Sequence, residues 1–388
     1  MKRKIISILG ILILTVVLTG CGTKKESSTT STNSSTSSAT TLLKTEEIFT
    51  DRDLEQNVDT EEAEKYEVKD NENITITKEG IYVITGSSKN TTIIVDSDDE
   101  AKVQLVLDNL EITNESTPCI YVKNADKVFV TTTSDNQLTV NNTFTADGET
   151  NTDAVIYSKD DLVLNGTGSL TISSTDNGIT SKDDLKITGG TIKIDCVSDG
   201  LEANDSIAIY DGTVTINSKK DGLHAEYSED DSVGYIYIKG GEVNITASDD
   251  AIHATTILQI EGGTLNISGK EGLEATKILI NDGTINIKAT DDGMNAGQKS
   301  NKYEVGIEIN GGEINIDMGQ GDTDAIDSNG TLTINGGTIN ITAQSPFDFD
   351  GEGQLNGGEV TVNGSKVEEL TNQMMGGPGG GQRGGRVR

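Results

Sequence analysis

Aromatic residues and cysteines are scarce in this chain, and their scarcity excludes two kinds of structure. The sequence has no tryptophan, aromatic residues make up 4% of it, and its nine tyrosines follow no fixed period. A regular platform of rings that would stack on flat sugar polymers is therefore not expected. Among the three cysteines, Cys119 and Cys196 lie several repeats apart, and we expect two buried free thiols rather than a disulfide.

Positive charge is also scarce. The chain has 63 acidic residues against 30 lysines and arginines, a formal net charge of −33. None of its five arginines lies between Arg52 and Arg383. This balance makes nucleic acids and anionic membrane surfaces poor partners. An anionic ligand would have to be bound by lysines or through metal ions.

A repeat of 21 to 23 residues fills the second half of the chain. Each copy has an acidic start, a short hydrophobic strand, a glycine-containing turn and a second strand such as residues 264–267 (TLNI). A fixed period of this length without helical spacing indicates a solenoid, whose repeats bury their apolar faces only against one another. The repeat suits a coil of three short strands, so we predict an all-β parallel β-helix of about twelve coils within residues 46–370. Strand alternation places Leu265 and Ile267 inside and Asn266 outside.

The two ends of the chain differ from the repeats. Residues 1–21 combine a basic start, an apolar run and an LTGC box, and they predict a signal peptide with lipidation of Cys21. Residues 22–45 are rich in serine and threonine and predict a flexible tether. The glycine-rich residues 371–388 predict a disordered tail. We therefore expect a monomeric domain, anchored through a lipid to the extracellular face of the cell membrane.

Polar residues recur at the first and fourth positions of the repeat, and we call these sets the position-one and position-four columns. The position-one column contains Asn177, Asp199, Asp221, Asp250, Glu271, Asp292 and Asp324. The position-four column contains Thr180, Glu202, His224, His253, Glu274, Asn295, Asp327 and Asp350. Adjacent coils would hold the carboxylates about 5 Å apart, where like charges repel. The columns therefore need counter-cations or raised pKa values.

Hard oxygen ligands in such numbers, with few imidazoles, favour Ca²⁺ over zinc or copper. We predict metal ligands at Asp249, Asp250, Glu271, Asp291, Asp292, Asn295, Asp324 and Asp327. We predict further ligand-binding residues at Asp221, His224, His253 and Glu274. Asp-Gly is also a favoured turn sequence, so a structural interpretation of part of the position-one column stays open. The two histidines lack a third softer ligand in the pattern, which favours polar floor residues over a transition-metal site.

Two further patterns surround these columns. Outward positions of the second strands predict a ladder of stacked polar side chains at Lys193, Thr215, Asn244, Asn266, Asn286, Asn315 and Asn340. Insertions at residues 226–233 and 297–305 both leave the coil just after position four. They predict a groove with an acidic floor over the coils between them.

Several motifs resemble a known family. The segments 74–86 (ITITKEGIYVITG), 103–109 (VQLVLDN) and 120–126 (IYVKNAD) resemble the N-terminal pattern of a clostridial group of secreted carbohydrate-binding β-helix proteins. The Asp-Asp-Gly segment from Asp291 to Asn295 and the GGTINI strands also resemble the right-handed parallel β-helices of polysaccharide lyase family nine. The resemblance covers roughly residues 70–365 and implies binding of cellulose and polygalacturonate without established catalysis. It further implies calcium at Asp249, Asp250, Asp291, Asp292, Asn295, Asp324 and Asp327.

Three functions follow as hypotheses. The first is calcium-dependent, non-catalytic binding of polygalacturonate, with cellulose as a further ligand. The second is a calcium-dependent pectate lyase with Lys220 or Lys270 as the base, although a lysine beside carboxylates should stay protonated. The third is a structural stalk or adhesin at the cell surface.

Overall fold

The computed structural model describes residues 42–319 and 323–372, and all of them belong to one compact unit, Ala39–Arg388. The predicted signal peptide, Cys21, most of the tether and most of the tail lie outside the described residues. Within the described ranges, no helix has the length and apolar character needed to span a membrane.

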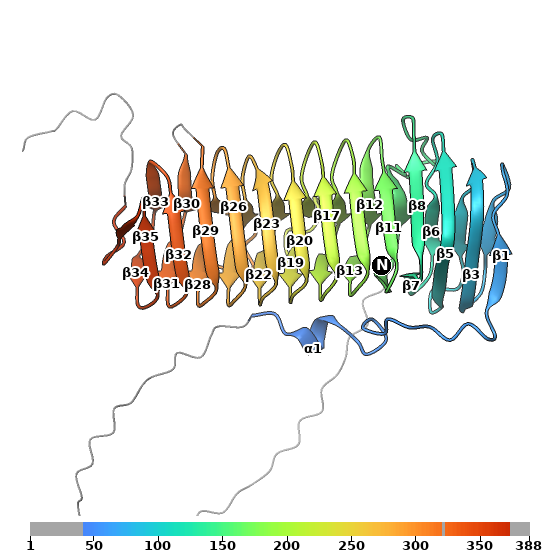
Figure 1. Cartoon of the computed structure of the whole chain (residues 1–388), viewed down its shortest axis with the longest axis horizontal. Coiled ribbons are helices and arrows are strands. Elements are labelled where there is room, and N and C mark those ends of the chain that lie inside the picture. Colours follow the sequence, from blue (N-terminus) through green and yellow to red (C-terminus); the bar gives the residue numbers. More distant parts are fainter. Residues whose placement is uncertain (1–41, 320–322, 373–388) are drawn as a thin grey trace, which may run out of the picture. The chain divides into compact units, whose positions relative to one another are not determined.

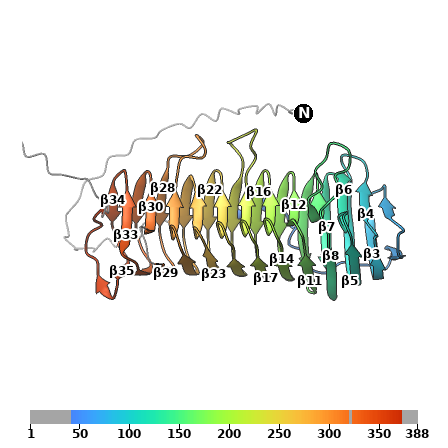
Figure 2. The same cartoon turned by 90° about the horizontal axis from the view of Figure 1, so that it is seen from above.

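The described residues form a parallel β-helix, in which successive coils stack along one axis (Figure 1). One sheet has twelve strands, which confirms the expected number of about twelve coils, and the other sheet has 24 strands. The larger sheet consists of two strand ladders that meet at a bend, so each full coil has three faces (Figure 2). The all-β solenoid predicted from the repeat is therefore confirmed.

The twelve-stranded sheet carries the position-four column, and we call it the acidic face. Its strands are β2 (Ile74–Ile76), β4 (Ile93–Asp96), β6 (Ile120–Asn124), β9 (Ala154–Ser158), β12 (Asn177–Ser181), β15 (Leu201–Ala203), β18 (Leu223–Ala225), β21 (Ile252–Ala254), β24 (Leu273–Ala275), β27 (Met294–Ala296), β30 (Asp324–Ser328) and β33 (Ser345–Phe349).

The next ladder along each coil packs against an N-terminal segment, and we call it the strap face. Its strands are β1 (Glu64–Glu67), β3 (Gly80–Lys89), β5 (Lys102–Asn114), β7 (Lys127–Thr132), β10 (Asp161–Gly166), β13 (Asp184–Ile187), β16 (Ser206–Ile209), β19 (Tyr235–Ile238), β22 (Ile257–Ile260), β25 (Lys277–Ile280), β28 (Gly306–Ile309), β31 (Thr331–Ile334) and β34 (Gly353–Leu355).

The last ladder of each coil is the amide face. Its strands are β8 (Asp135–Val140), β11 (Ser169–Ser173), β14 (Thr191–Asp195), β17 (Thr213–Asn217), β20 (Glu242–Thr246), β23 (Thr264–Gly269), β26 (Thr284–Ala289), β29 (Glu313–Met318), β32 (Thr338–Thr342) and β35 (Glu359–Val362), and β36 (Ser365–Lys366) pairs with β35 in antiparallel direction. The long strands β3 and β5 extend over both the strap face and the amide face.

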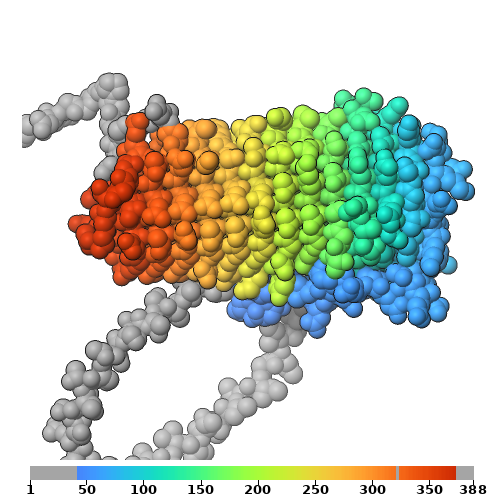
Figure 3. All heavy atoms as spheres, viewed as in Figure 1, coloured from blue at the N-terminus to red at the C-terminus, as the bar shows by residue number. Residues whose placement is uncertain are grey.

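Aliphatic side chains fill the interior of the coils. Leu265 and Ile267 are buried, Asn266 is exposed, and Leu265 pairs with Ile285 in the next coil. Burial of each such side chain contributes roughly 1.5 to 3 kcal/mol, and the parallel register repeats the contact in every coil. Figure 3 shows the outer surface of the same stack, where the atoms of successive coils lie in adjacent bands. Cys119 and Cys196 are free and buried as predicted, and burial raises the pKa of each thiol to about 12.

Glycine marks the turn between the strap face and the amide face. Gly263, between β22 and β23, has a φ of 91°, a backbone conformation that costs other residues free energy. A Cβ there would lie 2.8 Å from the carbonyl oxygen of Gly241 in the preceding coil. Gly-Gly and Asp-Gly turns therefore let successive coils approach closely enough for continuous strand pairing.

The amide ladder predicted on the second strands is confirmed from Asn244 to Asn340, whereas Lys193 pairs with Asp195. The Nδ2 group of Asn266 donates to Oδ1 of Asn244 at 2.9 Å, and Asn286 donates to Asn266 at 2.8 Å. Asn315 and Asn340 continue the series at 3.0 Å each. Each amide satisfies its neighbour, so the column stabilises the stacking of the coils.

The segment from residue 42 to residue 57 lies along the strap face and contains the short helix α1 (Thr45–Ile48) (Figure 1). Backbone N–H groups of Leu42 and Leu43 donate to the Gln259 side chain. Phe49 packs edge-to-face on Tyr210, with ring centroids 5.3 Å apart. We call residues 42–57 the strap.

Candidate metal-binding site on the acidic face

The position-four column is continuous across the acidic face. Neighbouring coils pair Glu202 with His224, His224 with His253, and His253 with Glu274. Asn295 and Asp327 follow in the same register.

The last member of this column differs from the sequence-based prediction. Asp327 pairs with Asp348, not with Asp350. The final coil has Ser345 at position one instead of an acid, so the pattern gave no starting point from which to count four positions.

Members of the position-one column hold the backbone of the next coil. Asp199 accepts a hydrogen bond from the N–H of Asp221 at 2.9 Å, and Asp221 accepts one from the N–H of Asp250 at 3.0 Å. Asp292 accepts one from the N–H of Asp324 at 3.1 Å. One oxygen of each of these carboxylates therefore has a structural role, in agreement with the structural interpretation left open by the sequence. The second oxygen is available for other contacts.

Three predicted residues converge where the two columns meet. Asp250, Glu271 and Glu274 each offer a carboxylate oxygen, and these oxygens lie within 4.8 Å of one another. Asn295 donates from Nδ2 to Glu271 at 3.1 Å. We call these four residues the carboxylate cluster. Among the described residues, Oδ1 of Asn295 and Oδ1 of Asp250 are buried without a hydrogen-bond partner.

The carboxylate cluster has strongly perturbed electrostatics. Burial, followed by repulsion from Glu274 and Asp250, raises the pKa of Glu271 from 4.5 to about 8. Burial also raises the pKa of Glu274, but a hydrogen bond from His253 and the charge of Lys299 outweigh it and lower that pKa to about 2. Lys299 Nζ lies 2.6 Å from Glu274 Oε1. Protonation therefore favours Glu271 over Glu274, and a cation could replace that proton.

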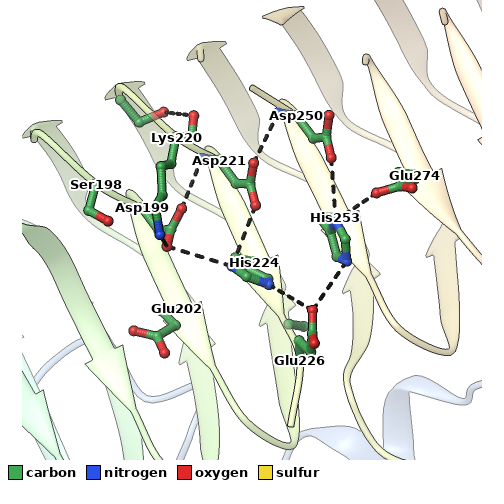
Figure 4. Close-up of polar contacts among 12 residues, drawn as sticks. Ser198, Asp199, Glu202, Lys220, Asp221, His224, Glu226, Asp250, His253 and Glu274 are labelled. Atoms are coloured by element: carbon green, nitrogen blue, oxygen red, sulfur yellow. Dashed lines mark hydrogen bonds and ion pairs between the residues drawn. The ribbon is translucent and has the colours of Figure 1, made fainter. Parts of the chain in front are cut away.

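The two histidines lie beside the carboxylate cluster with both ring nitrogens facing acids (Figure 4). Burial alone would lower their pKa values, but the carboxylates raise the pKa of His224 to about 10 and that of His253 to about 9. His253 Nδ1 lies 2.6 Å from Glu274 Oε2. Glu226, which the sequence did not single out, lies 3.3 Å from His224 Nε2. From the sequence alone, a contact between Glu226 and His224 could have been suspected only because Glu226 begins an insertion.

Two other predicted residues lie apart from the carboxylate cluster. Asp249 and Asp291 sit in a column with Lys270 between them, at 3.8 and 3.6 Å from its Nζ. The carboxylates of Asp249 and Asp291 therefore offset the positive charge of Lys270. Burial lowers the pKa of Lys270, but the surrounding acids outweigh it and raise that pKa above its usual value.

A second group of acids lies further along the acidic face. Burial and then repulsion from Asp292 and Asp348 raise the pKa of Asp327 to about 7. Burial is also the main cause that raises the pKa of Asp292 to about 6. Asp324 lies in the same group, and its carboxylate contributes to both shifts.

The two insertions leave the same corner of the coil, between the acidic face and the strap face. They project side by side in Figure 2, and side chains of the second loop contact the first. Asn301 contacts Asp231 at 3.4 Å, and Lys302 donates to the carbonyl oxygen of Ser232 at 2.9 Å. The two loops therefore contact each other across the coils between them. A surface pocket of about 410 Å³ opens on the other side of the first loop, lined by Lys182, Glu202, Asn204, His224, Glu226, Tyr227 and Ser228.

The donor set of the carboxylate cluster fits a hard divalent cation. Calcium takes six to eight oxygen ligands from carboxylates, amide carbonyls and water. Asp250, Glu271 and Glu274 supply carboxylate oxygens, and Asn295 supplies an amide oxygen that has no other partner among the described residues. A cation there would relieve the repulsion that raises the pKa of Glu271.

The fold and this face define a class: a parallel β-helix with a column of acids suited to binding cations. The chain belongs to the family of carbohydrate-binding domain-containing proteins, whose model matches residues 70–323 and 269–373. This result confirms the resemblance to a carbohydrate-binding family.

Two similar proteins extend the comparison. A protein from Acetivibrio thermocellus, also described as a carbohydrate-binding domain-containing protein, is 34% identical over 185 residues. The match covers 46% of this chain and 61% of that relative, so this chain spans less than two thirds of its length. Among solved structures, a polysaccharide lyase-like protein from C. thermocellum, a gadolinium derivative, has 25% sequence identity and a TM-score of 0.44. That match covers 77% of this chain and 94% of the other chain.

Proposed function

We propose that this protein binds an acidic polysaccharide of the polygalacturonate type without cleaving it, through calcium ions held on the acidic face. The observation that carries the proposal is the carboxylate cluster, whose three carboxylates lie within 4.8 Å of one another beside an unpartnered amide oxygen. Bound calcium supplies a bridge between these oxygens and a carboxylate of the polymer. Membership of a carbohydrate-binding family supports the choice of a polysaccharide.

The charges of the chain favour an acidic polymer bound through a cation. No arginine occurs between Arg52 and Arg383, so no guanidinium on the described coils can pair with a sugar carboxylate. Tyr121 and Tyr157, whose rings contact each other in neighbouring coils, are buried and offer no stacking platform. The protein residues of the cluster hold the ion, and Lys299 fixes the orientation of Glu274.

Cellulose would be a second, weaker ligand on a different surface. A shallow pocket of about 400 Å³ on the amide face is lined by polar groups that include Thr215, Asn244, Asn266 and Asn286. Each amide uses one donor and one acceptor in the ladder, so its remaining capacity can meet sugar hydroxyl groups.

The proposal also includes a location for the protein at the cell surface. Lipidation of Cys21 would anchor the domain to the extracellular face of the membrane, with the serine- and threonine-rich residues after it as the tether. A polysaccharide outside the cell would then be held at the surface.

Co-sedimentation with insoluble polygalacturonate tests the proposal. The protein should pellet with the polymer in millimolar calcium and stay in solution in a chelator. Glu271→Gln removes a ligand from the cluster, so the affinity should fall by about tenfold or more, equivalent to roughly 1.4 kcal/mol. Glu313→Gln, the same change at an exposed acid on the amide face, should bind normally. Calcium-independent pelleting, or equal losses in both variants, would contradict the proposal.

The lyase hypothesis predicts a different result. A base that removes the sugar C5 proton must be neutral, whereas Lys270 lies between two aspartates that raise its pKa. We expect no unsaturated product, detected by its ultraviolet absorbance, with calcium at neutral or alkaline pH. Product that forms in the wild type and disappears in Lys270→Ala or Lys220→Ala, but not in Lys239→Ala, would establish a pectate lyase instead.

A further inference from the structure

The side chains of His224, His253 and Glu226 converge on the acidic face, next to the carboxylate cluster. Glu226 Oε2 lies 3.3 Å from His224 Nε2 and 3.6 Å from His253 Nε2. The ligand atoms of all three residues lie within 4.8 Å of one another. Figure 4 shows both imidazole rings directed at the same carboxylate.

The backbone fixes this arrangement. His224 lies on β18 and His253 on β21, and the two residues are register partners in neighbouring parallel strands. Their ring centroids are 4.9 Å apart. Glu226 begins the first insertion, immediately after β18, and its backbone N–H is bonded to the carbonyl oxygen of Ala203. Two of the three side chains therefore project from a rigid sheet, and the third from the point where the loop leaves it.

The second nitrogen of each ring faces other carboxylates. His224 Nδ1 lies 3.4 Å from Asp221 Oδ2, and His253 Nδ1 lies 3.3 Å from Asp250 Oδ2 and 2.6 Å from Glu274 Oε2. Histidines that bind metals through one nitrogen commonly donate the other N–H to a carboxylate, which orients the ring. His253 has such a partner in Asp250, whereas His224 Nδ1 lies near Asp221 but makes no hydrogen bond. The Nε2 atoms of both rings face Glu226.

We propose that His224, His253 and Glu226 form a binding site for a divalent transition-metal ion of the zinc class. Zinc bound by imidazole nitrogen and carboxylate oxygen at about 2.0 to 2.2 Å in a tetrahedron has ligand atoms about 3.3 to 3.5 Å apart. The two distances from Glu226 agree with this spacing closely enough that small side-chain rotations would complete the site. Two imidazoles and one carboxylate form a recurrent set for zinc with an open fourth position.

Two of the three proposed ligands border a pocket. His224 and Glu226 line the 410 Å³ pocket together with Lys182, Glu202 and Tyr227. Lys182 is 2.9 Å from Glu202, so the pocket wall contains a cation held in place by an acid. The fourth ligand would be water or an oxygen of a bound molecule that enters this pocket.

Donor chemistry separates this site from the carboxylate cluster. Imidazole suits zinc and related first-row ions, whereas carboxylate and amide oxygens suit calcium. The zinc site uses none of the four residues of the carboxylate cluster as a direct ligand. The inference therefore does not depend on the proposed calcium-dependent function.

Isothermal titration of the purified full chain with Zn²⁺, in millimolar Ca²⁺ that fills oxygen-only sites, tests the inference. The wild type should bind one equivalent of zinc tightly. Removal of partners outside the coordination shell typically costs 10- to 100-fold in affinity, so loss of a ligand in His253→Gln or Glu226→Gln should cost about 100-fold or more. Co²⁺ in place of zinc should give the intense visible absorption of a four-coordinate ion in the wild type and not in these variants.

The matched control is Glu229→Gln, an identical change in the same loop. Glu229 is exposed, and among the contacts of the described residues its side chain accepts a hydrogen bond only from the Tyr227 hydroxyl group. The Glu229→Gln variant should therefore bind zinc with the affinity of the wild type. Glu226 is also exposed, so Glu226→Gln should fold normally even if a histidine variant does not, and thermal melts in a chelator verify this. Equal zinc affinity in the wild type and Glu226→Gln, or complete displacement of zinc by millimolar calcium, would overturn the inference.

Discussion

In the absence of calcium, the free energy of unfolding should be largest in mildly acidic solution and should fall as the pH rises. Glu271 carries much of this effect because its pKa is 4.5 when unfolded and about 8 when folded. The folded state therefore binds more protons than the unfolded state between these values, and the slope of stability against pH is negative. The contribution is present below about pH 4.5 and is lost as the pH rises through about 8.

Other groups on the acidic face act in the same direction. Asp327, with a folded pKa of about 7, loses its contribution in the same window. His224 and His253 have pKa values raised from 6.5 to about 10 and about 9, so their contributions are full below pH 6.5 and lost through pH 9 to 10. The metal-free protein should thus lose stability over the whole range from mild acid to alkaline pH.

Calcium should reverse much of this loss by replacing protons on the acidic face. A ligand that binds only the folded state stabilises it by about 2.7 kcal/mol at 100 times its Kd. Urea unfolding at pH 5 and pH 8, in a chelator and in millimolar calcium, measures the effect directly. The difference made by calcium should be larger at pH 8. Stability in chelator that is flat or rises with pH, or that does not respond to calcium, would contradict the prediction.

Glu271→Gln isolates the contribution of the carboxylate cluster. Glutamine does not titrate, so the variant should show a shallower decline with pH and a smaller response to calcium. Glu313→Gln, at an exposed position on the amide face, should retain the slope of the wild type.

Most of the fold could be predicted from the sequence because a solenoid repeats its local rules. Leu265 and Ile267 alternate with Asn266 in one strand, and neighbouring strands place the same residue types in register. The amide ladder follows from the same register. Periodicity thus specified both the core and the outward columns.

The contacts that leave the period could not be predicted. Glu226 reaches both histidines from a loop, and Lys299 reaches Glu274 from the other insertion. The contact of Lys270 with Asp249 and Asp291, by contrast, follows the period, because the three residues share a column one position before the acidic start of the repeat. The sequence therefore identified the acidic face, whereas the grouping of its residues depends on side-chain directions and loop paths.

The strap is the other feature without a periodic signal. It has no repeat of its own, and its apolar residues Ile48 and Phe49 become informative only where they cover Ala208 and Tyr237 on the strap face. Its polar anchor is Asp53, whose side chain is fully buried. Asp53 Oδ1 lies 3.3 Å from Lys127 Nζ, and Oδ2 lies 3.8 Å from Lys186 Nζ.

Asp53→Ala should destabilise the protein by about 3 to 5 kcal/mol, because removal of one partner leaves buried charges uncompensated. Lys127 and Lys186 retain contacts with Asp161 and Asp184 at 3.3 and 3.7 Å, so the lower end of this range is expected. The change also removes the carboxylate that accepts the N–H of Thr50 at 2.9 Å and so loosens the strap. Urea unfolding gives the cost, and Asp51→Ala, at an exposed site in the same segment, should change stability by less than about 0.5 kcal/mol. Equal small effects in both variants would mean that the strap contributes little to the stability of the coils beneath it.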